Sequence, residues 1–167
     1  RNVDLYEYLT NEEKDVENQI KNTSVDRNDM LKKIDELIFS SGEILRDPRI
    51  RYYDNEQDFN FSHLVDGRLY NREYEMMIHV ITQYYEHYDF DNDSVIMSHA
   101  LGKPELTILL PSDKRFWDDL KIAMQTDKCY DNIYNSQLKE SARTILSDKK
   151  AQNRERYINI KNRLATL

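Results

Sequence analysis

The sequence contains few of the residues that interrupt regular structure. Glycine and proline occur only three times each among 167 residues. Because both residues mark turns and break helices, their scarcity predicts long regular elements and few elaborate loops. No glycine-rich run precedes a Lys-Ser or Lys-Thr pair, which excludes nucleotide binding by a P-loop in this chain.

Cysteine and long apolar runs are equally scarce. The one cysteine, Cys129, cannot form an internal disulfide, and a packed thiol within a helix is the favoured interpretation. No apolar run approaches the roughly 20 residues of a membrane span. A net charge of −7 and 33% charged residues are typical of a soluble protein. We therefore expect a cytoplasmic protein that makes no membrane contact.

Motifs for metal binding and catalysis are also missing. Residues 89–94 resemble the opening of a calcium loop, but Ser94 stands where glycine is needed and Ala100 where a bidentate glutamate is needed. There is no glycine-flanked serine elbow, and no His/Cys spacing supplies the three or four ligands of a zinc site. We expect no catalytic residues, metal ligands or cofactor, although an enzyme site assembled from distant residues stays an alternative. The four histidines are His63, His79, His87 and His99. His79 and His99 have apolar neighbours, which favour packed or hydrogen-bonded roles.

The clearest structural signal is the run Leu-Thr-Ile-Leu-Leu-Pro-Ser-Asp at residues 106–113. Its β-branched and leucine residues predict a short buried strand that ends at Pro111. Ser112 or Asp113 then caps a helix, because Phe116, Leu120, Ala123 and Tyr130 follow at helical spacing.

The N-terminal region predicts a short strand and two helices. Residues 1–9 alternate weakly and are interpreted as a terminal strand. Thr10 and Glu13 form a capping box, which predicts a helix to about Asn22. Ser24 or Asp26 caps a second amphipathic helix, so the two helices predict an N-terminal helical hairpin.

After Pro48 the apolar period changes from that of a helix to that of a strand. We expect an α+β fold with a mostly antiparallel sheet of about five strands and packed helices. Asp66-Gly67 predicts a hairpin turn. A helix stays an alternative for the third strand, at residues 74–85, whose middle is nearly all β-compatible. The expected strands are 50–53, 59–65, 74–85, 95–101 and 105–110.

The C-terminal segment differs from the rest in charge. From residue 138 onward there are eight Lys or Arg residues and three Asp or Glu residues, so this segment has a net charge of +5 and the remainder of the chain −12. Its apolar spacing predicts a long basic helix, or two in succession, with polar interruptions at Lys149 and Asn153. A solvated face or an intramolecular contact with the acidic part is favoured over nucleic-acid binding. The candidate phosphate contacts are Lys149, Lys150, Arg154, Arg156, Lys161 and Arg163.

Several segments together resemble an internal region of the large P-loop ATPase of BREX bacteriophage-exclusion systems, the BrxC/PglY type. They occur in the same order as in that family, and none is a chemical motif. The segments are residues 8–20 (YLTNEEKDVENQI), 57–59 (QDF), 108–111 (ILLP), 116–120 (FWDDL), 125–128 (QTDK) and 138–143 (LKESAR).

The resemblance implies that the nucleotide-binding core lies upstream of Arg1, so ATP and Mg²⁺ are expected only in the parent protein. Residues 1–9 would then be a remnant strand of a preceding domain, 10–135 an α+β domain and 136–167 a helical extension or linker. The implied function is a non-catalytic structural and interaction module of a multidomain ATPase in phage defence. Its expected partners are other domains of the parent protein and other BREX components. A nucleic-acid-binding module that uses the basic helix, with DNA as its partner, is the alternative.

Overall fold

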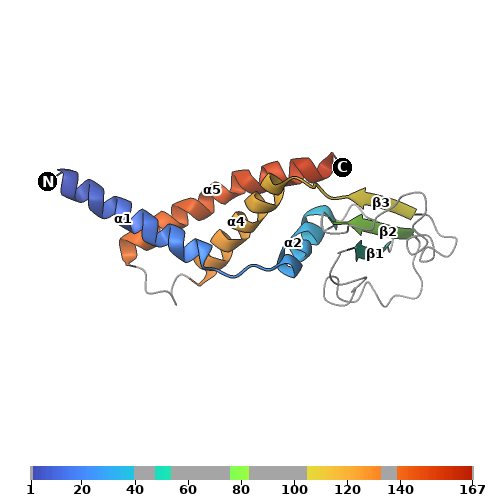
Figure 1. The fold of residues 1–167 in the computed structure, drawn as a ribbon, viewed down its shortest axis with the longest axis horizontal. Helices are drawn as coiled ribbons and strands as arrows, with labels where there is room; N and C mark the ends of the chain where they lie inside the picture. The colour runs from blue at the N-terminus through green and yellow to red at the C-terminus, as the bar shows by residue number, and fades with distance from the viewer. Residues whose placement is uncertain (1, 40–47, 54–75, 83–104, 133–138, 167) are drawn as a thin grey trace. The chain divides into compact units, whose positions relative to one another are not determined.

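The computed structural model describes residues 2–39, 48–53, 76–82, 105–132 and 139–166 (Figure 1). These residues form four helices and three strands, so the described part of the chain is a mostly helical α/β protein. They divide into two compact units. The helical unit comprises Arg1–Met30 and Lys114–Asn162, and the sheet unit comprises Leu31–Asp113 and Arg163–Leu167. In order, the elements are α1 (Asn2–Lys21), α2 (Arg27–Phe39), β1 (Pro48–Tyr53), β2 (Met76–Ile81), β3 (Glu105–Leu109), α4 (Lys114–Asp131) and α5 (Glu140–Ala165).

The sheet unit contains a parallel sheet with strand order β1-β2-β3. Ile50 of β1 pairs with Ile78 of β2, which pairs with Leu106 of β3. Ile50 and Ile78 are buried, as is His79, whose Nδ1 lies 2.6 Å from the hydroxyl oxygen of Tyr53. The strands predicted at 50–53, 74–85 and 105–110 are therefore confirmed where the structure describes them, at Pro48–Tyr53, Met76–Ile81 and Glu105–Leu109, and so is a packed, hydrogen-bonded role for His79. The predicted burial of the last strand is wrong, because Leu106 is 47% exposed and Leu109 43% exposed.

The predicted α+β fold with an antiparallel sheet of about five strands is wrong, because the three described strands are all parallel. The prediction assumed short turns between successive strands. Parallel neighbours instead need a crossover of a dozen or more residues, and the ranges 54–75 and 82–104 are long enough to supply one. The predicted strands 59–65 and 95–101 and the turn at Asp66-Gly67 lie outside the described residues.

The N-terminal predictions need two corrections. Residues 2–9 begin α1 and are not a strand, and Thr10 lies inside this helix instead of capping it. The weak alternation was misleading, since Leu5 and Leu9 are also spaced for one face of a helix. The predicted N-terminal helical hairpin is also replaced, because α1 packs with α4 and α5 in the helical unit. The domain boundaries predicted after residues 9 and 135 stay predictions.

The start of α2 confirms the predicted cap at Asp26. The Asp26 carboxylate accepts a hydrogen bond from the backbone N–H of Asp29 at 2.8 Å. The Asp29 carboxylate in turn accepts one from the backbone N–H of Asp26 at 3.1 Å. Each carboxylate therefore satisfies one of the free amides at the helix start.

The helical unit is built on a core shared by α1, α4 and α5. The helix predicted after Pro111 is confirmed as α4, and the basic segment forms a single helix, α5. Cys129 is buried here, as predicted. None of the described helices is long and apolar enough to cross a membrane. The buried members of this core are Val16, Ile20, Cys129, Ala142 and Leu146.

The end of α1 is held by side chains of α4. The side-chain amide of Gln125 donates to the backbone carbonyl oxygens of Lys21 and Thr23, at 3.3 and 3.0 Å. The Lys128 ammonium donates to the carbonyl oxygen of Ser24 at 2.7 Å. The last carbonyls of a helix lack partners within it, and Gln125 satisfies that of Lys21, the last residue of α1. The contacts with Thr23 and Ser24, which follow the helix, also hold the end of α1 against α4.

Candidate functional site

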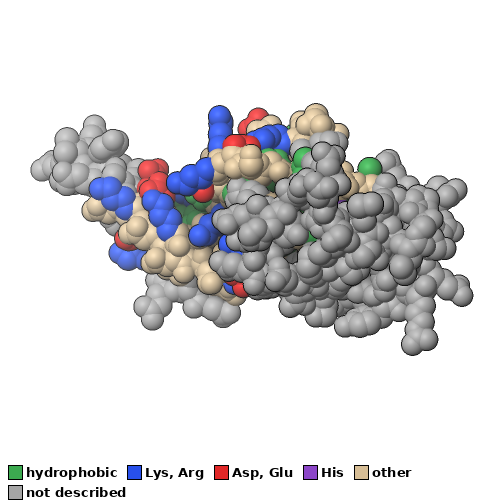
Figure 2. Space-filling view, turned by 45° about the vertical axis from the view of Figure 1, so that its right-hand side comes forward, with side chains coloured by type: hydrophobic (Ala, Val, Ile, Leu, Met, Phe, Trp, Pro, Cys, Tyr) green, Lys and Arg blue, Asp and Glu red, His purple; other side chains and the backbone are tan. Residues whose placement is uncertain are grey.

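All six candidate phosphate contacts lie on α5. Arg154 and Lys161 are exposed. Lys149, Lys150 and Arg163 contact acidic side chains outside α5. Arg156 contacts Asn153 on α5 itself. On the face drawn in Figure 2, Lys and Arg side chains are interspersed with Asp and Glu side chains. The structure therefore does not bring the six residues together as one basic surface within the described part of the chain.

Asp127 of α4 is the centre of a polar cluster between α4 and α5. Its Oδ1 accepts hydrogen bonds from Lys150 Nζ at 3.2 Å and Asn153 Nδ2 at 3.0 Å, and its Oδ2 accepts one from the Tyr157 hydroxyl at 2.8 Å. The three donors are spaced by three and four residues, which places them on one face of α5. Lys150 Nζ also lies 5.2 Å from the centroid of the Tyr130 ring, within cation–π range.

Asn153 connects this cluster to the backbone of α4. Its side chain is only 2% exposed, and its amide group donates a second hydrogen bond to the carbonyl oxygen of Ala123 at 2.7 Å. Its Oδ1 accepts a hydrogen bond from Nη1 of Arg156 at 2.8 Å. Both ends of the buried amide are thus satisfied, which explains the polar interruption of the apolar stripe at this position.

Lys149 and Arg163 pair with acidic residues in different units. In the helical unit, Lys149 Nζ lies 4.0 Å from Glu17 Oε1 on α1. In the sheet unit, Arg163 donates two hydrogen bonds to the Asp113 carboxylate, at 2.6 and 2.8 Å. The hydrogen bonds that Arg163 donates to Asp113 raise the pKa of Arg163, so the guanidinium stays charged at every pH relevant to the folded protein.

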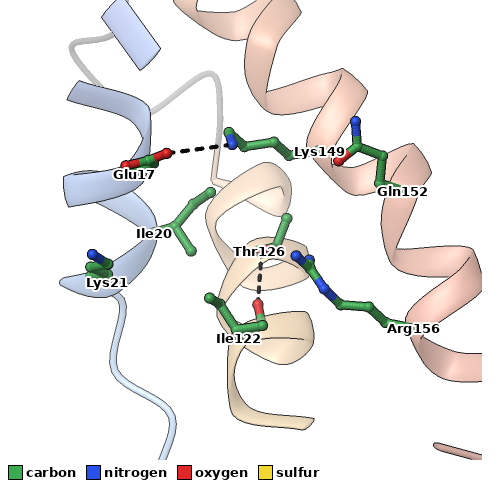
Figure 3. A pocket seen from close by; sticks show the side chains of 8 residues that line it. All are labelled: Glu17, Ile20, Lys21, Ile122, Thr126, Lys149, Gln152 and Arg156. Atoms are coloured by element: carbon green, nitrogen blue, oxygen red, sulfur yellow. Dashed lines mark hydrogen bonds and ion pairs between the residues drawn. The ribbon is translucent and has the colours of Figure 1, made fainter. Parts of the chain in front are cut away.

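A pocket of about 260 Å³ lies among α1, α4 and α5 in the helical unit (Figure 3). Lys149 extends from α5 toward Glu17 on α1, and Arg156 extends from α5 toward Thr126 on α4. The Thr126 hydroxyl donates to the carbonyl oxygen of Ile122 at 2.7 Å. The lining residues are Glu17, Ile20, Lys21, Ile122, Thr126, Lys149, Gln152 and Arg156.

The sequence identified two of these pocket residues, Lys149 and Arg156, as candidate phosphate contacts. It missed Lys21, and it missed Asp127 as the partner of the basic helix. The break in the apolar stripe at Asn153 was the available signal for a polar contact. Among the described residues, no group of three or more His, Cys, Asp or Glu side chains is arranged to hold a metal ion. The calcium-loop resemblance at 89–94 lies outside that part of the chain.

Comparison with protein families gives a match over residues 23–167. The matching family is described as the BREX ATP-binding protein BrxC 4th domain with six-stranded beta sheet. The matched range includes α2, α4, α5 and the three described strands of the sheet. No solved structure matches the chain.

Proposed function

Because the chain belongs to the family of the fourth domain of the BREX ATP-binding protein BrxC, we propose that it is a non-catalytic structural and interaction module of that multidomain ATPase. The family membership confirms the resemblance drawn from the sequence. The proposed role is to join the nucleotide-binding core to other domains of the parent protein and to other BREX components during phage defence in the cytoplasm. ATP and Mg²⁺ would act in the parent protein and not in this chain.

The observation that carries the proposal is how the charges of α5 are used. Lys149 contacts Glu17 on α1, and Lys150 contacts Asp127 on α4. The basic helix therefore pairs with carboxylates on two neighbouring helices of its own unit. This favours the intramolecular interpretation of its charge and supports a structural role for α5.

Two measurements on the purified chain test the proposal. We expect no Mg²⁺-dependent ATP hydrolysis above that of a buffer blank, and turnover that survives purification would contradict a non-catalytic role. We also expect saturable binding to a purified BREX component or to the nucleotide-binding region of the parent protein, measured by calorimetry. If none of these purified proteins binds, the interaction role is wrong.

Binding of DNA is the second candidate, and it rests on the exposed side chains of Arg154 and Lys161. Fluorescence anisotropy with duplex and single-stranded DNA, at low and physiological salt, tests it. Each lost phosphate contact reduces the slope of log affinity against log salt by about one. We expect the double variant Arg154→Glu, Lys161→Glu to lose binding if this candidate is correct.

The matched control for the DNA experiment is Arg115→Glu. Arg115 lies on α4, its side chain is 91% exposed, and it makes only a 4.0 Å contact with Asp119. Combined with Lys121→Glu, at an exposed lysine of the same helix, this variant reverses two positive charges of the same unit, as the double variant on α5 does. Equal loss of DNA binding in both variants would indicate a non-specific charge effect and not an interface on α5.

A further inference from the structure

We propose that the pocket among α1, α4 and α5 binds a small phosphate-bearing anion. The inference goes beyond the proposed function, because a structural module needs no small ligand. It rests on the charge, anchoring and size of the pocket, all within the helical unit.

The lining of the pocket is cationic although the chain as a whole is acidic. Lys21, Lys149 and Arg156 supply three positive charges, and Glu17 supplies one negative charge. The nearest carboxylate contact is loose, because Lys149 Nζ and Glu17 Oε1 are 4.0 Å apart and the Glu17 side chain is 52% exposed. An entering anion can therefore replace Glu17 as the partner of Lys149 at little cost.

Arg156 is positioned by its neighbours before any ligand binds. Its Nη1 donates to Asn153 Oδ1 at 2.8 Å, and Asn153 is fixed in turn by Ala123 and Asp127. A guanidinium carries five N–H donors, so this contact leaves donors for a ligand. The Lys21 end of α1 is also fixed, because Gln125 binds the Lys21 carbonyl oxygen. The Arg156 guanidinium, held by Asn153, therefore loses less conformational entropy when it binds an anion.

The charge and volume indicate the class of ligand. A phosphate monoester carries about −1.5 to −2 at pH 7, which matches the net charge of the lining better than a carboxylate does. Guanidinium and ammonium groups together are typical phosphate partners. A volume of about 260 Å³ lies below the usual 300–1,000 Å³ of drug-sized sites, so the ligand is small. Ile20 and Ile122 provide an apolar wall for its organic part.

Calorimetric titration of the chain at fixed ionic strength tests the proposal. The probes are inorganic phosphate, glycerol 3-phosphate and a short single-stranded oligonucleotide. We expect inorganic phosphate or glycerol 3-phosphate to bind. Tighter binding of glycerol 3-phosphate than of inorganic phosphate would identify a monoester as the ligand. No binding of either small probe, or binding of the oligonucleotide alone, would overturn the proposal.

Three substitutions separate this site from general charge effects. Arg156→Gln should weaken binding by about tenfold or more, because it removes a charge-assisted contact. Arg115→Gln makes the same change at an exposed arginine of α4 outside the lining, and it should leave the affinity unchanged. Glu17→Gln should tighten binding, because it removes the carboxylate that competes for Lys149.

The Glu17→Gln variant keeps the test decisive even if Arg156→Gln fails to fold. Loss of structure cannot produce tighter binding, whereas removal of a competing negative charge should. Unchanged affinity in Glu17→Gln would therefore contradict the proposed pocket. The proposed module function is unaffected by that result, because its test is the binding of purified BREX proteins.

Discussion

The side-chain amide of Asn153 in α5 donates a hydrogen bond to the backbone carbonyl oxygen of Ala123 in α4, at 2.7 Å. Both residues are buried, and the same amide group also donates to Asp127. Apolar helix faces tolerate small shifts along each other, but a buried amide needs its partners at fixed positions. This contact therefore fixes the alignment of α4 with α5 and, through Arg156, the position of one wall of the pocket.

We expect Asn153→Leu to lower the free energy of unfolding by about 1–3 kcal/mol. The substitution leaves the Asp127 carboxylate without one donor and removes the contact with the Ala123 carbonyl oxygen. Urea unfolding followed by circular dichroism measures the change. The matched control is Asn159→Leu, an exposed asparagine on the same helix, which should change stability by less than about 0.5 kcal/mol. Equal stability of the two variants would show that the buried contact does not stabilise the fold.

We expect Arg163→Lys to lower the melting temperature of the chain, and to do so less at high salt. Lysine keeps the charge but cannot form the two parallel hydrogen bonds that Arg163 makes with Asp113. Both side chains are roughly half exposed, so added salt screens their attraction. Differential scanning calorimetry at two salt concentrations measures the effect. Arg115→Lys is the control, because the 4.0 Å contact of Arg115 with Asp119 is not such a pair of hydrogen bonds. An equal change in melting temperature in this control would contradict the explanation.

The sequence located most described elements but not the direction of the strands. Apolar spacing identified α4 and α5, and strand-like runs identified β1, β2 and β3. Strand direction depends on how the intervening chain returns, and spacing within a strand carries no information about that. The apolar runs at residues 106–110 and, interrupted by His79, at 76–81 were the local signs of a parallel sheet, whose strands are buried on both faces. In α1, a weak alternation fitted a strand and a helix equally well.

The candidate site was only partly predictable for a similar reason. Asn153 was visible as a polar break in an apolar stripe, but its partner Asp127 is one of 31 acidic residues in the chain. Only the packing of α4 on α5 selects that carboxylate. Lys149 and Arg156 were identified by charge, whereas Lys21 joins them only because α1 packs beside α4.

The buried thiol of Cys129 should make stability fall at alkaline pH. Burial raises the pKa of this thiol, and a hydrogen bond with Thr23 offsets part of the increase. The folded protein therefore holds the thiol proton more tightly than the unfolded chain does. The associated stability is fully present below the ordinary thiol pKa of about 8.5 and is lost as the pH rises through the folded value.

A comparison with Cys129→Ala isolates this effect from other groups that titrate at alkaline pH. The stability of the wild-type chain relative to this variant should fall between pH 8 and 10, by no more than about 1.4 kcal/mol per pH unit. Urea unfolding at several pH values gives the difference. Labelling by a disulfide reagent should also be slow in the folded chain and fast in urea, since the thiolate is the reactive form. A constant difference across this range, or rapid labelling of the folded protein, would show that burial does not hold the thiol protonated.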